Sequence, residues 1–449
     1  TAGSVGSLAR WFYHIDQLRR RGLICRSLYA DGDLLATLVP LSPFPVAPSP
    51  GAGRNGSGPP ANVHRPWKVG SNGAPEAANA PFILSRFAYL RREGRKLVLE
   101  SPLVPARLIL HDPRAMAVIG GLGEPVTIAD LAGPSGALAD DAIRELVALL
   151  IDANMVDRVD AGASAENAEP AEGAPAVAGN PALEFWEFHD LLFHARSRRG
   201  RSDGRFGGTC RFAARRPPPP ALMADNALEW CDLHRPDLER LERKDPPLAL
   251  VQNRRRSIRE YAAEPMTMQQ LGEFLYRVAR MTRYWQTEIP APAGPIAMEF
   301  TSRPYPAGGG LHELEFYTVI NACQGLDRGL YHYDPQQHRL GRLSRPTRET
   351  GMLLKEAAAS AGIAPETLQV HVILAARFER LSWKYESIAY SLILKDVGVI
   401  YQTMYLAATA MGLAPCALGC GDSDLFARAA GTDYYVETSV GEFLLGSQQ

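Results

Sequence analysis

The sequence predicts an α+β protein, with one mixed C-terminal domain preceded by smaller modules of helices and hairpins. Beyond residue 245, segments rich in β-branched and aromatic residues alternate with segments whose apolar residues recur at helical spacing. The front part carries two hairpin signals and short helical patterns, separated by stretches rich in Pro, Gly and Ala. With 449 residues, 46% of them hydrophobic and 22% charged, the chain is long and apolar enough to fold around sizeable cores.

Changes in composition mark the domain boundaries. Two stretches are poor in large apolar side chains, so burial cannot offset the entropy cost of ordering them, and we interpret both as linkers. A third break, where Pro217–Pro220 follow two arginines, predicts a stiff extended connector. The expected order is a helix–hairpin module at 1–40, a flexible linker at 41–81, a winged-helix-like module at 82–158, a linker at 159–182, a connecting segment at 183–245 and a C-terminal domain at 246–449.

The first module begins with helical spacing over residues 8–22, where Gly22 stands at the C-cap position. A hairpin over residues 27–39 follows, since Asp31 and Gly32 accept the positive φ of a tight turn.

The second module predicts another hairpin over residues 82–101, around Glu93-Gly94. Two helices follow, at 128–131 and 139–151, and Thr127 with Asp130 forms a capping box for the first. Helices combined with paired strands at this size are typical of winged-helix modules.

The charge pattern argues against nucleic acid as the partner of these modules. The best candidate recognition helix, at 138–151, carries Asp140, Asp141 and Glu145 against a single Arg, whereas phosphate neutralisation needs cations. Overall, 48 Lys and Arg balance 49 Asp and Glu, a net charge of -1, so no global field attracts DNA or an anionic membrane. Protein or peptide docking is the favoured role, and a purely structural role stays open.

Targeting signals are not evident in the sequence. Residues 11–21 are amphipathic, unlike a secretory signal. The uncharged stretch 397–421 is long enough to span a bilayer, but polar residues and Pro415 interrupt it, which favours a buried helix. Six cysteines in this length are no disulfide framework, and Cys416 with Cys420 alone make a poor metal site. We expect a soluble cytoplasmic protein.

In the C-terminal domain, Thr267 and Gln270 form a capping box at the start of an amphipathic helix. Strands are expected at 315–322, 369–376 and 441–445. A buried helix is expected over residues 397–411, capped by Gly412.

The segment NRRRSIREY, residues 253–261, is the first candidate for chemistry. Arg254, Arg255, Arg256 and Arg259 surround Ser257, and we expect this run directly before a helical segment, where it suits a phosphate and a polar ring edge. A solvated basic face is the alternative.

The segment RPYPAGGGLHELEFY, residues 303–317, is the second candidate for chemistry. Three consecutive glycines let backbone N–H groups approach a flat or anionic ligand. No Lys-Ser or Lys-Thr follows the glycines and the G-x-G-x-x-G spacing fails, which excludes a P-loop and a dinucleotide fingerprint. A plain tight loop is the alternative.

Two further segments complete the set. In LSWKYESIAYS, residues 381–391, the adjacent Lys384 and Tyr385 supply a proton acceptor and a donor, unless they are an exposed Lys and a packed Tyr. APCALGCGDSD, residues 414–424, is expected to form a small-residue loop after the buried helix.

Taken in order over residues 250–446, these four segments resemble the flavin-dependent nitroreductase superfamily, and within it the SagB-type azoline dehydrogenases of cyanobactin and azole-modified peptide pathways. The segment at 183–201 is similar to the one that precedes the catalytic domain in those proteins. The resemblance implies a nitroreductase-like FMN-binding fold behind winged-helix-like, peptide-binding modules.

The resemblance also implies roles for individual residues. The flavin-binding positions are Arg255, Arg256, Ser257, Arg259, Ala307, Gly308, Gly309, Leu418 and Gly419, and the Lys-Tyr pair associated with azoline oxidation is Lys384 and Tyr385. Ala307 replaces the family's usual Ser. Ile388, Ser391 and Val399 stand where the family usually has two Arg and a His, so contacts to flavin or substrate differ there.

The implied activity is oxidation of peptide thiazolines or oxazolines to thiazoles or oxazoles by an FMN enzyme, with oxygen as the electron acceptor. The implied partners are a heterocyclised precursor peptide, a cyclodehydratase or synthetase, and a second copy of the chain in a homodimer. One alternative is an NAD(P)H-dependent nitroreductase or quinone reductase, which would not need the long front section. The other is a non-catalytic subunit that docks peptides.

Overall fold

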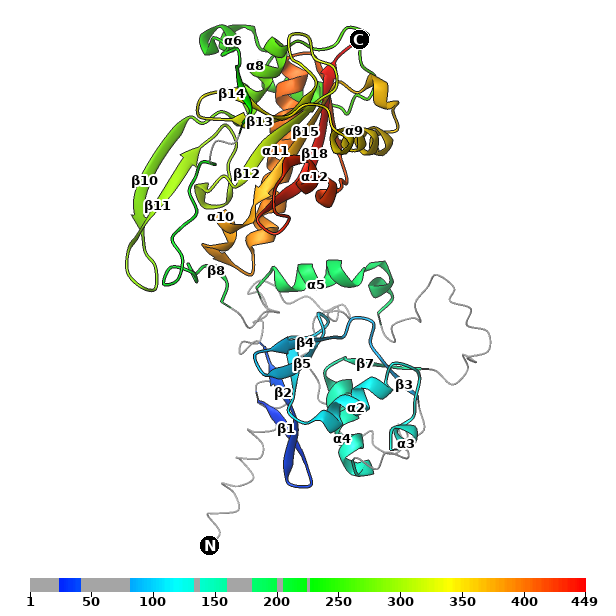
Figure 1. Cartoon of the computed structure of the whole chain (residues 1–449). Helices are drawn as coiled ribbons and strands as arrows, with labels where there is room; N and C mark the ends of the chain where they lie inside the picture. Colours follow the sequence, from blue (N-terminus) through cyan, green and yellow to red (C-terminus); the bar gives the residue numbers. More distant parts are fainter. Residues whose placement is uncertain (1–23, 42–80, 133–137, 160–179, 200–204, 224–226) are drawn as a thin grey trace, which may run out of the picture. The chain divides into compact units, whose positions relative to one another are not determined.

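The computed structural model describes residues 24–41, 81–132, 138–159, 180–199, 205–223 and 227–449. The chain divides into two compact units, residues 1–204 and 205–449, and each is described by itself (Figure 1). The predicted helix at 8–22 lies outside the described residues, as do nearly all of the predicted linkers at 41–81 and 159–182.

The first unit contains a five-stranded antiparallel sheet in the order β1-β2-β6-β5-β4. Its strands are β1 (Arg26–Ala30), β2 (Asp33–Pro40), β4 (Tyr89–Glu93), β5 (Lys96–Glu100) and β6 (Ala106–Leu110). Both predicted hairpins are confirmed, and their turns contain positive φ angles at Asp31, Gly32 and Gly94. Because β2 also pairs with β6, the hairpin of the expected 1–40 module and the strands of the expected 82–158 module share one sheet and one core.

The helices of this unit are α2 (Pro113–Gly121), α3 (Ile128–Leu131), α4 (Asp140–Asp152), the 3-10 turn η2 (Pro181–Phe185) and α5 (Phe188–Arg196). The capping box of Thr127 and Asp130 at α3 is confirmed. α4 buries its apolar face and leaves Asp140, Asp141 and Glu145 exposed. A short pair, β3 (Phe82–Leu84) with β7 (Val156–Arg158), completes the unit. The winged-helix assignment stays a prediction.

The second unit is built on a seven-stranded antiparallel sheet in the order β17-β18-β15-β12-β13-β14-β9. The strands are β9 (Glu229–Asp232), β12 (Leu314–Ile320), β13 (Gly329–Asp334), β14 (Arg339–Ser344), β15 (Val370–Arg377), β17 (Leu413–Leu418) and β18 (Glu437–Ser447). This confirms the three predicted strands. Since β9 lies upstream of residue 246, the C-terminal domain takes in part of the predicted connecting segment.

Helices cover both faces of this sheet, as Figure 1 shows. One core contains α8 (Met268–Ala279) and α11 (Ala389–Ala410), and the other contains α9 (Arg348–Ala361) and α12 (Ser423–Ala430). Side chains of β15 alternate between the two cores, so this strand is buried along nearly its whole length and has a continuous apolar sequence. The remaining elements are α6 (Leu238–Lys244), α7 (Leu248–Arg254), α10 (Phe378–Ser382), the hairpin β10 (Arg283–Ile289) with β11 (Ile296–Ser302), and the pair β8 (Gly207–Gly208) with β16 (Tyr385–Glu386).

Three expectations need correction. Residues 413–418 form the edge strand β17 and not a loop, because they pair with β18 along their whole length. The long helix begins at Ala389, eight residues before the expected start at residue 397. The expected start followed the charged residues Lys395 and Asp396, which in fact lie within the helix. The arginine run follows the end of α7 instead of preceding a helix, so no helix N-terminus lies directly behind it. Among the described helices, none combines the length and the apolar character needed to cross a bilayer.

Candidate active site

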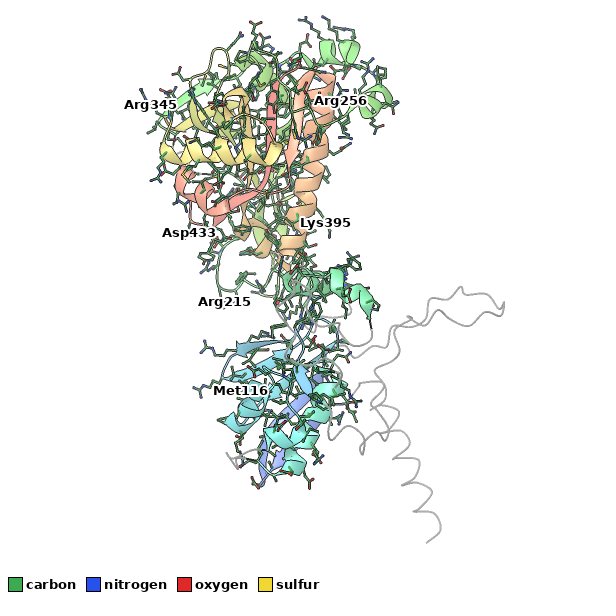
Figure 2. The ribbon with its side chains drawn as sticks, turned by 90° about the vertical axis from the view of Figure 1, so that its right-hand side faces the viewer. Met116, Arg215, Arg256, Arg345, Lys395 and Asp433 are labelled. Carbon is green, nitrogen blue, oxygen red and sulfur yellow. The ribbon has the colours of Figure 1, made fainter. Side chains whose placement is uncertain are left out.

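Helix α11 links the arginine run, β17 and the glycine loop. Tyr405 bonds to the Ser257 hydroxyl and the Ala417 N–H, and Asp396, nearer the N-terminus of the helix, accepts the Gly308 N–H. Between them, Tyr401 bonds to Glu442 of β18, the strand that pairs with β17. Asp396 and Tyr405 are separated by about 14 Å along the axis at the usual helical rise. In Figure 2, Arg256 and Lys395 are labelled toward the two ends of this helix.

The arginine run lies beside the C-terminal half of α11. The hydroxyl groups of Ser257 and Tyr405 are hydrogen-bonded at 2.7 Å, and the same Tyr405 hydroxyl accepts the Ala417 N–H at 2.9 Å. The Arg255 guanidinium lies over the Tyr405 ring, 5.2 Å from its centroid. Tyr405 therefore fixes the run against both the helix and β17.

The charges of this run are free for a ligand. Arg254, Arg256 and Arg259 are exposed, and no carboxylate among the described residues forms an ion pair with them or with Arg255. Such a group of cations suits a phosphate, which accepts several charge-assisted hydrogen bonds.

Leu418 and Gly419 lie at the end of β17, next to the middle of α11. Leu418 is buried and pairs with Glu442 of β18, whose N–H is donated to the Tyr401 hydroxyl at 2.5 Å. Gly419 is exposed, and a Cβ added to it would meet no atom within 4 Å. The turn at Gly419 thus leaves open space beside the backbone.

The triple-glycine loop lies beside the N-terminal half of α11. Gly308 donates its N–H to Asp396 Oδ2 at 2.8 Å. Gly309 and Gly310 have φ of +63° and +69°, a region that L residues rarely adopt. A Cβ on Gly309 would overlap the Tyr385 hydroxyl and stand 3.2 Å from Lys384 Nζ. Close approach therefore explains Gly309, and Ala307 precedes it in extended backbone.

Lys384 and Tyr385 are half-buried beside this loop. Burial lowers the pKa of Lys384, with a further lowering from Arg380, while Cys210 acts in the opposite direction. The Lys384 ammonium nitrogen is 5.5 Å from the centroid of the Phe300 ring. Burial also raises the pKa of Tyr385, and the carboxyl group of Asp396 adds to this rise. Both shifts favour the neutral amine and the protonated phenol, the forms that accept and donate protons.

Residues 207–221, which we call the proline strap, hold this pair from the other side. Gly208 pairs with Tyr385, and the Cys210 N–H is donated to the Lys384 carbonyl at 3.0 Å. Further along, the Trp383 indole N–H is donated to Arg216 O at 3.0 Å, and Arg380 Nη1 to Pro219 O at 2.6 Å. The predicted connector therefore holds the segment that carries Lys384 and Tyr385 in place.

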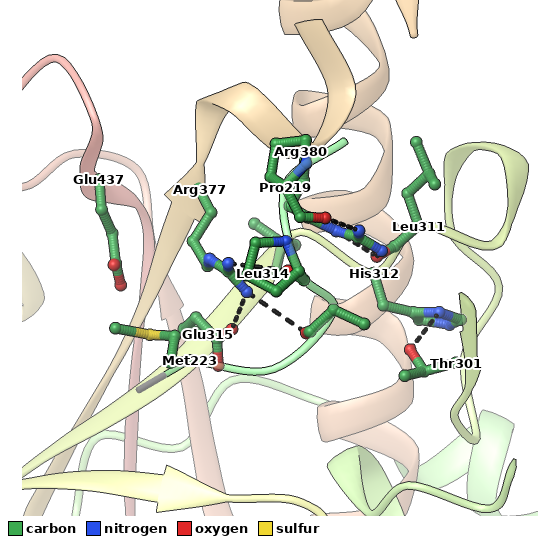
Figure 3. Close-up of polar contacts among 12 residues, drawn as sticks. Pro219, Met223, Thr301, Leu311, His312, Leu314, Glu315, Arg377, Arg380 and Glu437 are labelled. Atoms are coloured by element: carbon green, nitrogen blue, oxygen red, sulfur yellow. Dashed lines mark hydrogen bonds and ion pairs between the residues drawn. The ribbon is translucent and has the colours of Figure 1, made fainter. Parts of the chain in front are cut away.

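Arg380 is a buried anchor of the proline strap. Its guanidinium is fully buried and donates to the carbonyl oxygens of Pro219 and Leu311 (Figure 3). It also donates to Glu299 O. Burial lowers its pKa to about 10, so the group stays charged at neutral pH.

Arg380→Met is expected to lower the free energy of unfolding by about 3 kcal/mol, because the buried Leu311 carbonyl oxygen and two partly buried carbonyl oxygens lose a charged donor. It should also speed limited proteolysis within the proline strap, which can be followed by mass spectrometry of the fragments. Arg216→Met is the matched control, since the Arg216 side chain is exposed and its ion pair within the described part of the chain is with exposed Glu379. Equal melting temperatures and cleavage rates for the two variants would contradict the anchoring role.

Four residues that hold the candidate site together were not predicted for this role from the sequence. Tyr401 and Tyr405 fall in the segment 397–411 that was expected to be a buried helix, and their spacing of four is a core pattern; only their hydroxyl partners show the second role. Asp396 and Glu313 were not singled out, although an acid in an otherwise apolar helix and an acid directly after a glycine loop were both visible signals.

Two family models match the chain. Residues 82–203 match the model described as cyanobactin oxidase ThcOx, and residues 253–446 match the nitroreductase family. The second match contains all of the candidate site residues.

Two curated relatives agree with these matches. The chain is 28% identical over 191 residues to MJ1384 of Methanocaldococcus jannaschii, described as a nitroreductase, covering 42% of this chain and 83% of that protein. It is 29% identical over 117 residues to the trifolitoxin-processing protein TfxB of Rhizobium leguminosarum bv. trifolii. That match covers 26% of this chain and 31% of TfxB, so it spans about a third of the length of that relative.

Solved structures show likenesses as well. A nitroreductase from Ralstonia eutropha JMP134 aligns with a TM-score of 0.38 at 17% identity, covering 55% of this chain and 99% of that one. A chain of the E. coli microcin synthetase McbBCD complex with truncated pro-MccB17 bound aligns with a TM-score of 0.35 at 18% identity, covering 58% and 92%.

Proposed function

We propose that this chain, an oxidoreductase with a nitroreductase-family domain at residues 253–446 and a cyanobactin-oxidase segment at 82–203, is an FMN-dependent azoline dehydrogenase. It would oxidise thiazolines or oxazolines in a peptide to thiazoles or oxazoles. The observation that carries the proposal is the contact between the Gly309 backbone and the Lys384–Tyr385 pair, because it sets an amine and a phenol at the edge of a loop suited to a flat ligand.

The residues present fit FMN. The exposed arginines and Ser257 at one end of the site suit a phosphate, and the glycine loop at the other end lets backbone approach a planar ring where a Cβ would interfere. The two ends are about 14 Å apart along α11, a separation suited to a ligand with a phosphate at one end and a ring system at the other. Arg255, Arg256, Ser257 and Arg259 would hold the first, and Ala307, Gly308, Gly309, Leu418 and Gly419 would surround the second.

The proposed reaction removes two electrons and two protons from the azoline ring. Lys384 Nζ, in its neutral form, would take the proton from the ring carbon next to the carbonyl, and Tyr385 would hydrogen-bond the group on which negative charge develops. When bound, FMN would supply the acceptor for the hydride that leaves the neighbouring carbon, with oxygen as the final acceptor of the two electrons. The proline strap would keep the amine in place and limit its access to water.

A peptide substrate is supported by the first unit. It matches a cyanobactin oxidase model, and one relative is a trifolitoxin-processing protein. A heterocyclised precursor peptide, delivered by a cyclodehydratase or synthetase, is therefore the substrate that we propose. We also propose a homodimer, which gel filtration of the FMN-loaded protein tests by its apparent mass.

The decisive experiment combines a spectrum with mass spectrometry. We expect the purified protein to show flavin absorbance and to remove 2 Da from an azoline-containing peptide in air. Rapid NADPH oxidation with nitro or quinone substrates, and no 2 Da loss, would favour the reductase alternative. A colourless protein that binds the peptide, and stays inactive after FMN is added, would favour the docking subunit.

A further inference from the structure

Glu313 is a buried acid for which the proposed chemistry has no use. It directly follows the loop that carries Gly308 and Gly309, and its side chain is fully buried. Apart from its own backbone N–H, no N–H or O–H group among the described residues is donated to its carboxyl oxygens. An ionised carboxylate in this position would lack water and a donor from any other residue, which is costly.

The partner of Glu313 is a second carboxyl group. Asp396 of α11 lies within hydrogen-bonding reach of it and at the same time accepts the Gly308 N–H at 2.8 Å. Two carboxyl groups can hydrogen-bond to each other only if one of them carries a proton. The arrangement therefore requires a shared proton if Glu313 is to have a partner at all.

The surroundings favour this state. Burial, followed by the charge of Asp396, raises the pKa of Glu313 to about 8, and burial raises the pKa of Asp396 as well. The other titratable or charged groups that face the two acids are Arg303, Tyr305, Arg380, Lys395 and Tyr385. The cations reduce the rise in pKa but do not remove it.

We propose that one proton shared between Glu313 and Asp396 holds the Gly308–Gly309 loop against Lys384 and Tyr385. Both acids are then positioning residues for the base, a role that rests on the proposed function only for its effect on turnover. When the pair loses this proton, two adjacent carboxylates repel each other, and the Asp396–Gly308 hydrogen bond no longer has a fixed acceptor. The loop should therefore loosen as the pH rises from 7 to 9.

The test measures the loop directly. Hydrogen–deuterium exchange of the protein without added flavin, followed on peptides that cover residues 305–313 and corrected for the intrinsic pH dependence, gives the protection of the Gly308 amide. We expect protection in the wild type to fall about tenfold between pH 7 and pH 9, as for a group that titrates near 8. In Glu313→Gln the side-chain amide donates permanently to Asp396, so protection should stay within twofold.

A second variant and a control complete the design. Asp396→Asn keeps an acceptor for Gly308 and a donor for Glu313, and should also be insensitive to pH. Glu366→Gln, at an exposed position, should behave like the wild type. Titration of the same proteins with FMN should show the same pattern. Affinity for FMN should be several-fold weaker at pH 9 than at pH 7 in the wild type and in Glu366→Gln, and unchanged in Glu313→Gln and Asp396→Asn. The shared proton would be disproved if protection in the wild type did not change with pH, or if protection in Glu313→Gln and Asp396→Asn depended on pH as strongly as in the wild type.

Failure of the wild type to bind FMN would contradict the proposed function but would not affect the interpretation of the exchange result.

Discussion

Lys384→Ala is expected to lower kcat for azoline oxidation by about 10²–10⁴-fold while FMN remains bound, because it removes the proposed proton acceptor. The amine is half-buried next to Gly309, and burial lowers its pKa, so at a given pH a larger fraction of it is neutral than of an exposed lysine. For the wild type, kcat should rise with pH up to this lowered pKa and then level off. The measurement is single-turnover oxidation of an azoline peptide, with flavin occupancy read from the absorbance.

Two further substitutions separate the roles of charge and position. Lys384→Arg keeps a cation but cannot supply a free base, so it should be nearly as inactive as the alanine variant. Lys355→Ala removes an exposed lysine on α9 and should leave turnover unchanged. Full turnover by Lys384→Ala with bound FMN would show that the base lies elsewhere. Activity retained by Lys384→Arg alone would indicate an electrostatic role for the cation instead of proton transfer.

Residue patterns predicted the elements of the nitroreductase-family domain well where local sequence decides structure. The capping box at Thr267 and the strands within β12 and β15 form as expected, since side-chain capping and continuous apolar runs act over a few residues. β17 was missed because its small residues, with a central Pro415, have the composition of a loop. Its pairing with β18 is a long-range contact that overrides this local preference.

For the candidate site, too, local sequence predicted some features, whereas others depend on long-range packing. Glycine spacing and the Lys-Tyr pair identified the segments, but not the side chains that hold them together. Tyr405 and Asp396 belong to α11, whose sequence predicts burial alone, and their polar roles depend on which distant loops pack against the helix. The proline strap illustrates this most clearly: four consecutive prolines predict an extended segment, whereas the buried donors of Arg380 and Trp383 determine where that segment lies.

Gly309→Ala is expected to reduce turnover at least about 100-fold, because a methyl group at this position overlaps the Tyr385 hydroxyl and displaces the Lys384 amine. The substitution also forces a non-glycine residue into positive φ, which costs about 1 kcal/mol of stability. Gly362→Ala separates the two effects. Gly362 has a similar φ of +70°, but a Cβ there meets no atom within 4 Å. It should lose the same stability in thermal unfolding and keep full turnover.

A double-mutant cycle with Tyr385→Phe tests the contact itself. Removing the phenolic oxygen leaves 3.2 Å between the new methyl group and the nearest remaining atoms, Tyr385 Cζ and Lys384 Nζ, which small shifts can accommodate. Gly309→Ala should therefore cost much less in the Tyr385→Phe background than in the wild type, although Tyr385→Phe is itself slower. Equal losses of turnover in the two backgrounds would mean that the methyl group acts through backbone strain and not through contact with the phenol. Gly362→Ala, which introduces a similar strain without a nearby side chain, gives the loss of stability expected from strain alone. The two comparisons together assign the requirement for glycine either to the fold or to the place where an amine and a phenol meet the loop.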